Sequence, residues 1–540
     1  MKKSIKCLSA VLMTSVLAVS AGAVAAPTFA GAYDIIMSST TGHTYTAYQV
    51  FTGDLYESGT TKTLSNIHWG NGVDKTALIA ALTGDTTYGA AFSTALTGKT
   101  TDDEKAAAVA AQLATYSSAS DLKALAKIIG AHLGTPQAGL TGLSAGYYLI
   151  KDTTTATSMP DGDTYSEFML EVVSNVTVNA KDTTVQSTKT VTETEDTVPT
   201  VTPNLKVADY DIGDSIPYEL TFTLPSNYAD YVNYPITFTD DMCAGLTYNS
   251  DAKIYYGTSD TTGTDIAFTS GGTSSYTGGT LWTSATVDLK AHTPALTAGT
   301  VIKVKYTATL NSNAAVNDVG NPNKNHVTFY SDPNVSTTPG AGDTTTPPPP
   351  TNDTPDDTTV VFTYELVFNK VDDQATPQPL TGANFKLEKN VGGTWTDVTA
   401  LHTGTGAINP SKTDKSTGAA VDTSSTTSFS FKGLDAGSYK LTEITTPSGY
   451  NTIAPIEFTV TATKSGTAVT NIGSTVLSSP TVTFNSSNAQ IAADIQNNKG
   501  IELPGTGGIG TTVFYIIGGL MITGALVLFI VKKRMNIKEK

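Results

Sequence analysis

Cysteine is almost absent from this chain of 540 residues, which holds only two. Cys7 lies in an N-terminal segment that we expect to be removed, and Cys243 then remains alone. A single cysteine cannot form an intrachain disulfide, so disulfides are excluded as the staples of the mature domains. Another kind of stabilisation has to be sought in the sequence.

Charge is also scarce, at 15% of residues, and basic residues are the minority, with 32 Lys and Arg against 48 Asp and Glu. An acidic chain lacks the basic face that nucleic acid requires. The six histidines show no zinc spacing, and neither a phosphate-binding glycine loop nor a nucleophile elbow is present. The sequence therefore predicts no metal, no cofactor, no nucleic-acid partner and no enzymatic turnover.

The first segment, residues 1–30, has the pattern of a secretory signal peptide. Three lysines in the first six residues precede an apolar run from Leu8 to Val19. Small-residue cleavage patterns end at both Ala25 and Ala30, and the sequence leaves the choice between them open. We expect the mature chain to be exported.

The last segment, residues 501–540, combines a short motif, an apolar stretch and a basic tail. The stretch Val513–Val531 is about long enough to span a bilayer, and by itself it would indicate an ordinary single-pass anchor. The motif that precedes it is Leu503, Pro504, Gly505, Thr506 and Gly507. At this spacing the segment resembles the sorting signal of Gram-positive sortase substrates. The resemblance implies that a sortase cysteine attacks the Thr506–Gly507 carbonyl and that an amine resolves the acyl-enzyme.

Composition divides the mature chain into three parts. A proline-rich linker spans residues 344–357, and a softer break lies near 182–190. Residues 31–182 mix strand patterns with helical ones, including a capping box at Thr101 and Glu104. Residues 183–343 and 358–500 alternate apolar and polar residues between turns. We predict a mainly β protein with two tandem Ig-like β-sandwiches after a mixed α+β N-terminal domain.

Ionisable residues occupy the apolar phase of three strands in the third part. Lys370 follows Phe362, Tyr364, Leu366 and Phe368 in phase, Glu443 follows Tyr439 and Leu441, and Asn497 follows Ile491, Ala493 and Ile495. Residues i and i+2 share a face of a strand, so all three side chains are predicted to point into one core. Asn498 adjoins Asn497, and strand phase favours Asn497.

The middle part repeats the pattern in the same chain order. Lys189 is in phase with Val185 and Val191, Asp240 with Ile236 and Phe238, and Asn325 with Val327 and Phe329. One polar residue in the apolar phase of a strand end arises easily by chance. Two ordered sets of lysine, acid and asparagine favour a shared chemical purpose.

Burial explains what such a set can do. It lowers the pKa of a lysine from about 10.4, which frees a nucleophilic amine, and it raises the pKa of a carboxyl group, which then keeps a proton. A neutral amine can attack an asparagine carbonyl that the protonated acid polarises. The expected products are a Lys–Asn isopeptide bond across the sandwich and ammonia. Such bonds would replace the missing disulfides.

The chain resembles the backbone pilins of sortase-assembled Gram-positive pili over its whole length. Tyr439–Glu443 followed by Pro447–Tyr450 is similar to the E-box of collagen-adhesin B-type domains. The resemblance implies that Glu443 catalyses a bond between Lys370 and Asn497. The Ile212–Asp214 turn resembles the middle domain of these pilins, which implies matching roles for Asp240, Lys189 and Asn325.

Shaft pilins also use an exposed lysine, at the end of a Val-x-Val-Tyr-Pro-Lys motif, as the acceptor in polymerisation. The corresponding run here is Val176–Lys181, which lacks the Tyr and the Pro. Val176 and Val178 face one side of the expected strand, so Lys181 faces solvent, where an intermolecular nucleophile has to lie.

These observations predict a structural shaft subunit, secreted and anchored to peptidoglycan, with Thr506 joined to Lys181 of the next subunit. The expected partners are a pilin-class (class C) sortase, a housekeeping sortase, identical subunits, minor pilins and peptidoglycan. The alternative is a monomeric wall-anchored adhesin that holds a host surface ligand.

Overall fold

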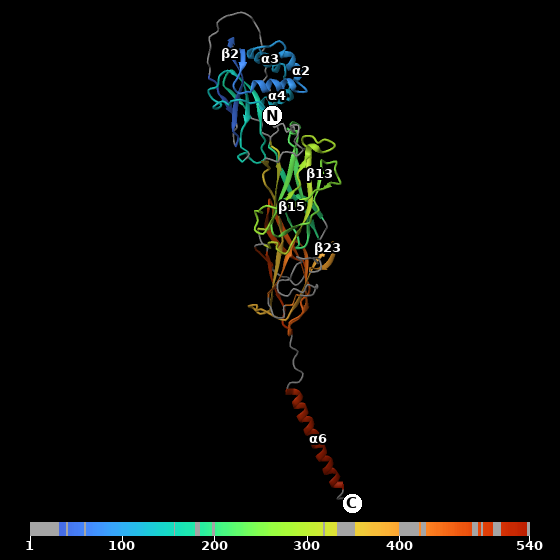
Figure 1. Ribbon diagram of the computed structural model, residues 1–540. Coiled ribbons are helices and arrows are strands. Elements are labelled where there is room, and N and C mark those ends of the chain that lie inside the picture. Colours follow the sequence, from blue (N-terminus) through green and yellow to red (C-terminus); the bar gives the residue numbers. More distant parts are fainter. Residues whose placement is uncertain are drawn as a thin grey trace.

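The computed structural model describes residues 32–38, 42–58, 61–155, 157–178, 184–196, 200–316, 319–331, 352–398, 421–422, 428–477, 484–487, 490–500 and 509–536. Three bodies follow one another along a rod in chain order, with a single long helix at the C-terminal end (Figure 1). The predicted mainly β architecture is confirmed.

The N-terminal domain packs four helices on one four-stranded antiparallel sheet. The sheet order is β3-β2-β4-β5, and β1 pairs with β6 in a separate parallel ribbon. The elements are β1 (Ile35–Met37), β2 (Tyr45–Ser58), β3 (Thr61–Trp69), α1 (Lys75–Gly84), α2 (Gly89–Leu96), α3 (Asp102–Leu113), α4 (Ala119–Gly130), β4 (Gly146–Asp152), β5 (Glu167–Val172) and β6 (Val176–Val178). Thr101 and Glu104 form the predicted capping box at the start of α3, because each side chain satisfies an amide that the first helical turn leaves unpaired.

The middle domain is a sandwich of two sheets with the orders β14-β13-β18-β10-β7-β8 and β15-β16-β11-β19-β21-β9. Its elements are β7 (Ser187–Glu195), β8 (Thr200–Leu205), β9 (Val207–Asp209), β10 (Ser215–Thr223), η1 (Tyr228–Asp230), β11 (Pro235–Met242), β12 (Leu246–Tyr248), β13 (Lys253–Tyr256), β14 (Thr264–Asp265), β15 (Phe268–Ser270), β16 (Thr280–Ser284), β17 (Val287–Asp288), η2 (Leu289–Ala291), β18 (Val301–Leu310), β19 (Asn321–Phe329), β20 (Asn352–Asp353) and β21 (Asp357–Phe362). Every second side chain of β10, β18 and β19 is buried, as the alternation predicted.

The third domain is a second sandwich, with the sheet orders β26-β22-β31-β30 and β24-β23-β27-β28-β29. Its strands are β22 (Tyr364–Val371), β23 (Asn384–Val391), β24 (Thr394–Asp397), β25 (Val421–Asp422), β26 (Ser428–Leu434), β27 (Gly437–Thr445), β28 (Ile456–Ser465), β29 (Ala468–Val476), β30 (Phe484–Ser487) and β31 (Gln490–Gln496). The strand β22 runs parallel to β31 in the middle of its sheet. The first and last regions of the domain are therefore neighbours.

The boundary between the middle and third domains differs from the prediction. We expected the third domain to begin at residue 358, but β21 pairs with β19 and β9 in a sheet of the middle domain. Phe362 therefore belongs to the middle domain and does not share a strand with Lys370. Only Thr363 separates β21 from β22, so the alternation continues across the boundary without a turn signal. The predicted proline-rich linker at 344–357 lies mostly outside the described residues.

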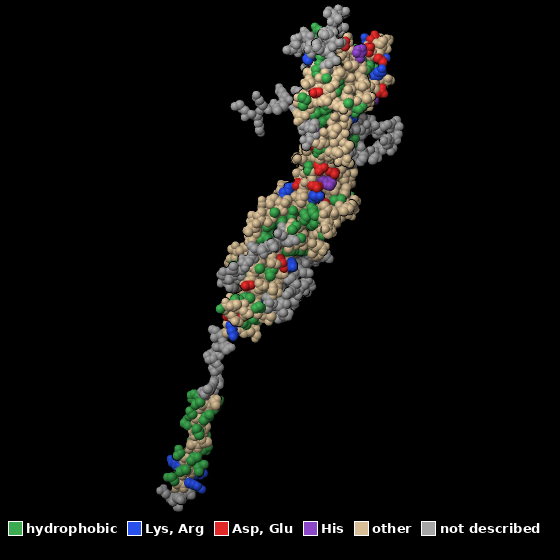
Figure 2. Space-filling view, turned by 90° about the vertical axis from the view of Figure 1, so that its left-hand side faces the viewer, with side chains coloured by type: hydrophobic (Ala, Val, Ile, Leu, Met, Phe, Trp, Pro, Cys, Tyr) green, Lys and Arg blue, Asp and Glu red, His purple; other side chains and the backbone are tan. Residues whose placement is uncertain are grey.

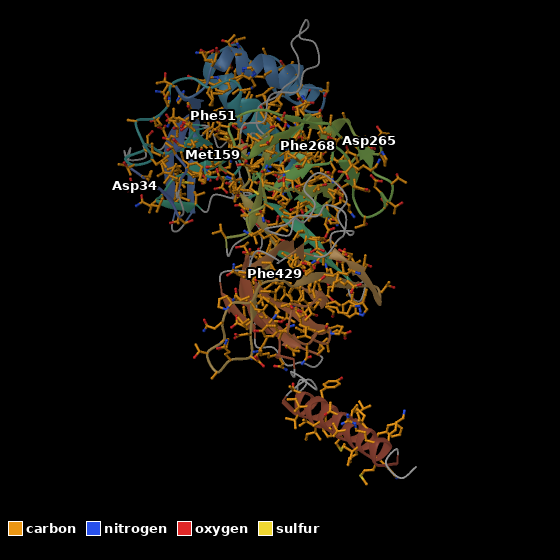
Figure 3. All side chains as sticks on the ribbon, turned by 90° about the horizontal axis from the view of Figure 1, so that it is seen from below. Asp34, Phe51, Met159, Asp265, Phe268 and Phe429 are labelled. Carbon is orange, nitrogen blue, oxygen red and sulfur yellow. The ribbon has the colours of Figure 1, made fainter. Side chains whose placement is uncertain are left out.

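The cores show how the three domains are joined. One continuous cluster of buried apolar side chains runs through both sandwiches, whereas the N-terminal domain has two clusters of its own. Side chains fill the interior of each body, as around Phe51 in the N-terminal domain and Phe429 in the third domain (Figure 3). The middle and third domains thus form one packed unit.

The helix α6 (Ile509–Asn536) is unlike every other described element, because its apolar side chains are exposed all round. Its segment Thr512–Met535 is long and apolar enough to cross a membrane, and none of it is buried against the protein. Basic side chains gather near its C-terminal end (Figure 2). This agrees with the predicted membrane stop.

Candidate functional site

Lys189 of β7 is the first of the predicted nucleophiles, and its side chain is completely buried in the middle domain. Its Nζ donates to Asp240 Oδ1 at 2.5 Å and to the hydroxyl of Tyr306 at 2.8 Å. The rings of Tyr218 and Tyr306 lie 5.2 and 5.5 Å from the amine. Burial lowers the pKa of Lys189 to about 8, although Asp240 opposes this shift. The neutral, nucleophilic form of this amine is therefore far more populated near neutral pH than that of an exposed lysine.

Asn325 of β19 lies directly opposite Asp240 of β11 in the antiparallel ladder. Cβ atoms of such pairs are about 5 Å apart, so the amide and the acid are neighbours on the inner face. Both polar atoms of the buried Asn325 amide, and Asp240 Oδ2, have no hydrogen-bond partner among the described residues. Leaving such a group without a hydrogen bond costs about 1–3 kcal/mol, so the free side-chain amide of Asn325 is unfavourable in this core.

Sequence analysis missed two polar neighbours of this triad, Asn323 and the hydroxyl group of Tyr306. Asn323 is also buried, two residues before Asn325 in the same phase of β19, and its Nδ2 donates to the Tyr306 hydroxyl at 2.9 Å. Strand phase alone does not separate these two asparagines. The register does, because Asp240 is paired with Asn325 and Met242 is paired with Asn323.

Lys370 of β22 is the second predicted nucleophile, and it is also fully buried. Its Nζ donates to the carbonyls of Val371 at 3.1 Å and Ile495 at 3.0 Å. The backbone N–H of Asn497 donates to the same Val371 carbonyl at 3.1 Å. The amine and the asparagine are thereby held at one place. Burial lowers the pKa of Lys370 to about 8.

Asn497 follows β31 and points into the core, while Asn498 is exposed. Its Nδ2 donates to both carboxylate oxygens of Glu443 at 3.0 Å and to the Asn451 carbonyl at 2.9 Å. Glu443 Oε2 also accepts from the backbone N–H of Ile453 at 3.0 Å, which orients the carboxyl group. Asn497 Oδ1 has no partner among the described residues.

The two triads therefore present the chemistry that an isopeptide bond needs, with different topologies. In the middle domain β7 and β19 belong to opposite sheets, so a Lys189–Asn325 bond would cross the sandwich as expected. In the third domain β22 and β31 are adjacent strands of one sheet, and the acid comes from the opposite sheet. A Lys370–Asn497 bond would join neighbouring strands, which corrects the expectation of a bond across the sandwich.

The remaining predicted site residues lie outside the described residues. These are Lys181 and the sorting motif Leu503, Pro504, Gly505, Thr506 and Gly507. The chain on either side of Lys181 is held by defined contacts. The strand β6 pairs with β1 upstream, and downstream the Thr184 hydroxyl donates to Asp163 Oδ1 at 2.8 Å. His43 lies between Asp163 and Asp152, with its Nδ1 2.7 Å from Asp152 Oδ2.

A third buried lysine, Lys389 of β23, was not singled out from the sequence. It is in phase with Phe385 and Leu387, so the signal that found Lys189 and Lys370 was present. Its amine contacts three aspartates rather than an asparagine: Asp196, Asp211 and Asp435. Burial opposes protonation of Lys389, but the carboxylates around it raise its pKa well above the ordinary value. This lysine stays charged, so it is no nucleophile.

Comparison with known proteins adds the family. Residues 364–475 match the family model SpaA, described as a prealbumin-like fold domain, and residues 495–536 match the LPXTG cell wall anchor motif. The chain is 27% identical over 417 residues to the trypsin-resistant surface T6 protein of Streptococcus pyogenes serotype M6, covering 66% of this chain and 70% of that protein. These matches make the chain similar to sortase-assembled pilins. Like them, it is a secreted structural subunit of the pilus shaft, attached to the cell wall, and not an enzyme.

The comparison with solved structures also returned pilins, two of which are the following. The T6 backbone pilin of serotype M6 Streptococcus pyogenes is 17% identical, with a TM-score of 0.47, and the match covers 87% of this chain and 98% of that one. The full-length major pilin SpaD of Corynebacterium diphtheriae is 13% identical, with a TM-score of 0.44 and coverages of 87% and 98%. The likeness to pilins rests on the two family models and the T6 relative.

Proposed function

We propose that a pilin-class sortase joins this subunit through Thr506 to Lys181 of the next subunit, and that Lys189–Asn325 and Lys370–Asn497 bonds stiffen each copy. In the sortase step the thioester between the enzyme cysteine and Thr506 breaks and the Lys181 amine forms an amide in its place. In each internal step the lysine Nζ bonds to asparagine Cγ, the Cγ–Nδ2 bond breaks, and Nδ2 leaves as ammonia. Asp240 and Glu443 move the proton from the attacking amine to the leaving nitrogen.

The observation that carries the proposal is the position of the two triads along the chain. Lys181 lies just before β7, which bears Lys189, and Thr506 follows soon after Asn497. Tension that enters a subunit at Lys181 and leaves at Thr506 would reach Lys189 and Asn497 early. Each internal bond then carries the tension past most of its sandwich, so the sheets stay folded under load.

The N-terminal domain lies outside this path, because Lys181 follows it in the chain. Consistently, no lysine in its described residues is buried. A domain that bears no tension gains little from a covalent staple. We propose that minor pilins and the housekeeping sortase complete the assembly, the latter by joining the last Thr506 to peptidoglycan.

Replacing the acceptor lysine tests the polymer linkage. Lys181→Ala should abolish the high-mass ladder of surface protein on denaturing gels and leave a wall-attached monomer, because the sorting signal is intact. The exposed Lys99→Ala is the matched control and should leave the ladder unchanged. An unchanged ladder in Lys181→Ala would exclude this lysine as the acceptor. A wild-type chain that forms no ladder would favour the monomeric adhesin.

A further inference from the structure

The middle and third domains meet at a group of charged residues that neither the polymer linkage nor the internal bonds use. On the third-domain side are two lysines, Lys389 of β23 and Lys464 of β28, together with Asp435. The middle domain contributes only acids: Glu193 and Asp196 at the end of β7, and Asp209 and Asp211 at the end of β9. We call these seven residues the interdomain clamp.

Lys389 makes the first half of the clamp. Its Nζ donates to Asp196 Oδ2 and to Asp211 Oδ2, each at 2.6 Å, and to Asp435 of its own domain. Asp211 reaches across as well, because its Oδ1 accepts the backbone N–H of Asp435 at 2.8 Å. The side chains of Lys389, Asp211 and Asp435 are all at least 95% buried.

Lys464 makes the second half, where it is paired with both Glu193 and Asp209 of the middle domain. Asp209 Oδ2 also accepts the backbone N–H of Ala436 at 3.0 Å. Backbone hydrogen bonds also cross between the two domains: Ile212 N–H donates to the Gly433 carbonyl and Gly392 N–H to the Asp196 carbonyl, both at 2.9 Å. Gly433 has a φ of +81°, and a Cβ there would lie 2.5 Å from Ile212. The contact is therefore closely fitted.

The charges of the clamp do not balance. Two lysines face five carboxyl groups in a largely buried site, and unpaired buried carboxylates are costly. Among the described residues, the other titratable groups that the clamp faces are Tyr439 and Tyr364 of the third domain and Tyr210 and Asp214 of the middle domain, and none of these is a cation. Protonation of some of the carboxyl groups reduces this excess of negative charge.

We propose that the interdomain clamp is a proton-dependent lock: it holds the middle and third domains as one rigid rod while two of its carboxyl groups keep their protons, and it loosens when those protons are lost. Glu193 and Asp435 are the two groups, because each shares its lysine with a second carboxyl group, Asp209 or Asp211, that also accepts a backbone N–H and is thereby stabilised in its charged form.

The electrostatics agree with this assignment. Burial and the adjacent Asp209 raise the pKa of Glu193 to about 8. Burial opposes ionisation of Asp209, but Lys464 outweighs it and the pKa of Asp209 is lowered. Burial and Asp211 raise the pKa of Asp435 well above its ordinary value. Each half of the clamp thus contains one carboxyl group that keeps its proton, Glu193 in one and Asp435 in the other.

The sign of the pH dependence follows. A carboxyl group whose pKa is raised in the closed interface binds a proton that the open interface releases. Closure is therefore most favoured below about pH 4.5, and the advantage of Glu193 is lost as the pH rises towards about 8. The opening equilibrium should rise by up to about tenfold per pH unit for each proton released.

If the proposed internal bonds form, the clamp lies beside the part of the subunit that is least protected against tension. Between Asn325 and Lys370 a single stretch of chain links the two cross-linked domains. Tension there would pull β21 from its places beside β19 and β9. A closed clamp bridges that stretch from β7 and β9 to β23 and β28, so a subunit would be stiffer in acid than in alkali.

Hydrogen–deuterium exchange of the full-length protein, measured by mass spectrometry from pH 5 to pH 9 and corrected for intrinsic exchange, tests the clamp. Peptides covering residues 207–214 and 432–436 should lose protection as the pH rises to about 8, while β10 peptides should not. Glu193→Gln mimics the protonated acid and should keep those peptides protected at pH 8 and above. Glu219→Gln, at a partly exposed ion pair with Lys303, is the matched control and should behave as wild type.

Two results would overturn the proposal. One is protection of the interface peptides that is constant across this pH range in the wild type. The other is a Glu193→Gln protein with the same pH dependence as the wild type. Asp435→Asn repeats the test at the other half of the clamp, so a folding defect in one variant leaves the other decisive. Neither variant touches Lys181 or the triads, so the ladder should persist even if the clamp is refuted.

Discussion

The triads of the middle and third domains each contain a lysine, an acid and an asparagine. Their acids contact different reacting groups. Asp240 contacts the Lys189 amine, which is the nucleophile. Glu443 instead contacts Nδ2 of Asn497, the nitrogen that leaves as ammonia. Each acid has to exchange a proton with both the lysine amine and the asparagine Nδ2, because the proton taken from the amine is the proton that the leaving nitrogen needs. The comparison shows two arrangements of one proton transfer.

Topology explains why the arrangements differ. Asp240 and Asn325 are neighbours in one sheet, and the lysine comes from the opposite sheet. In the third domain the lysine and the asparagine share a sheet, and the acid comes from the opposite one. The chemistry therefore requires that three side chains converge in a dry core, and it does not require a particular pair to be adjacent on one sheet.

Removing the acids should have the largest effect and should be equal in the two domains. Asp240→Ala and Glu443→Ala should each lose one ammonia instead of two. The intact mass of each variant should therefore exceed the mass calculated with both bonds by one ammonia. Each should also lower the free energy of unfolding by about 4 kcal/mol, as expected for opening a covalent loop of on the order of 100 residues. Mass spectrometry and thermal unfolding measure both. Asp241→Asn is the matched control, because its side chain contacts Ser274 and Ser275 instead, and it should retain both bonds. If Glu443→Ala kept its ammonia loss, the role given to this acid would be wrong.

Lys389→Met should have the next largest effect and sharpens the contrast between buried lysines. The change leaves buried carboxylates without their cation, and loss of one partner of a buried ion pair costs about 3–5 kcal/mol. Partial protonation of the acids reduces this, so we expect about 3 kcal/mol in chemical denaturation. The mass should still show the loss of two ammonia molecules, because Lys389 takes part in neither bond. A variant that lacked one ammonia loss would contradict this separation.

The smallest effect is a pH dependence that the internal bond itself should remove. Asn325→Ala leaves Lys189 as a free amine whose pKa is lowered to about 8 by burial. Between about pH 8 and pH 10 the unfolded chain then binds more protons than the folded one, so stability rises with pH by roughly 1 kcal/mol per unit. The bonded wild type has no amine to titrate there and should show no such rise in urea unfolding at these pH values. A rise of equal size in the wild type would mean that Lys189 is unbonded.

The strand alternation of the sequence predicted most of the buried site residues. Lys370 and Asn497 were placed in the core from phase alone, and the structure buries both while Asn498 is exposed. The same rule would have found Lys389, which follows Phe385 and Leu387 in phase, but its partners Asp196 and Asp211 belong to another domain. The domain boundary was misplaced because β21 passes into β22 with only one residue between them.

Sequence by itself determined the features that depend on short stretches of chain: the export and sorting segments, the capping box of α3, and the face on which each strand residue lies. Those features follow from local composition and from the fixed period of a strand. Tertiary structure alone decided that Asp240 contacts a lysine while Glu443 contacts an asparagine, and that Lys389 meets acids from the neighbouring domain. These contacts depend on which distant strands pair and pack, because a residue's phase says that it points inward and does not say what it meets.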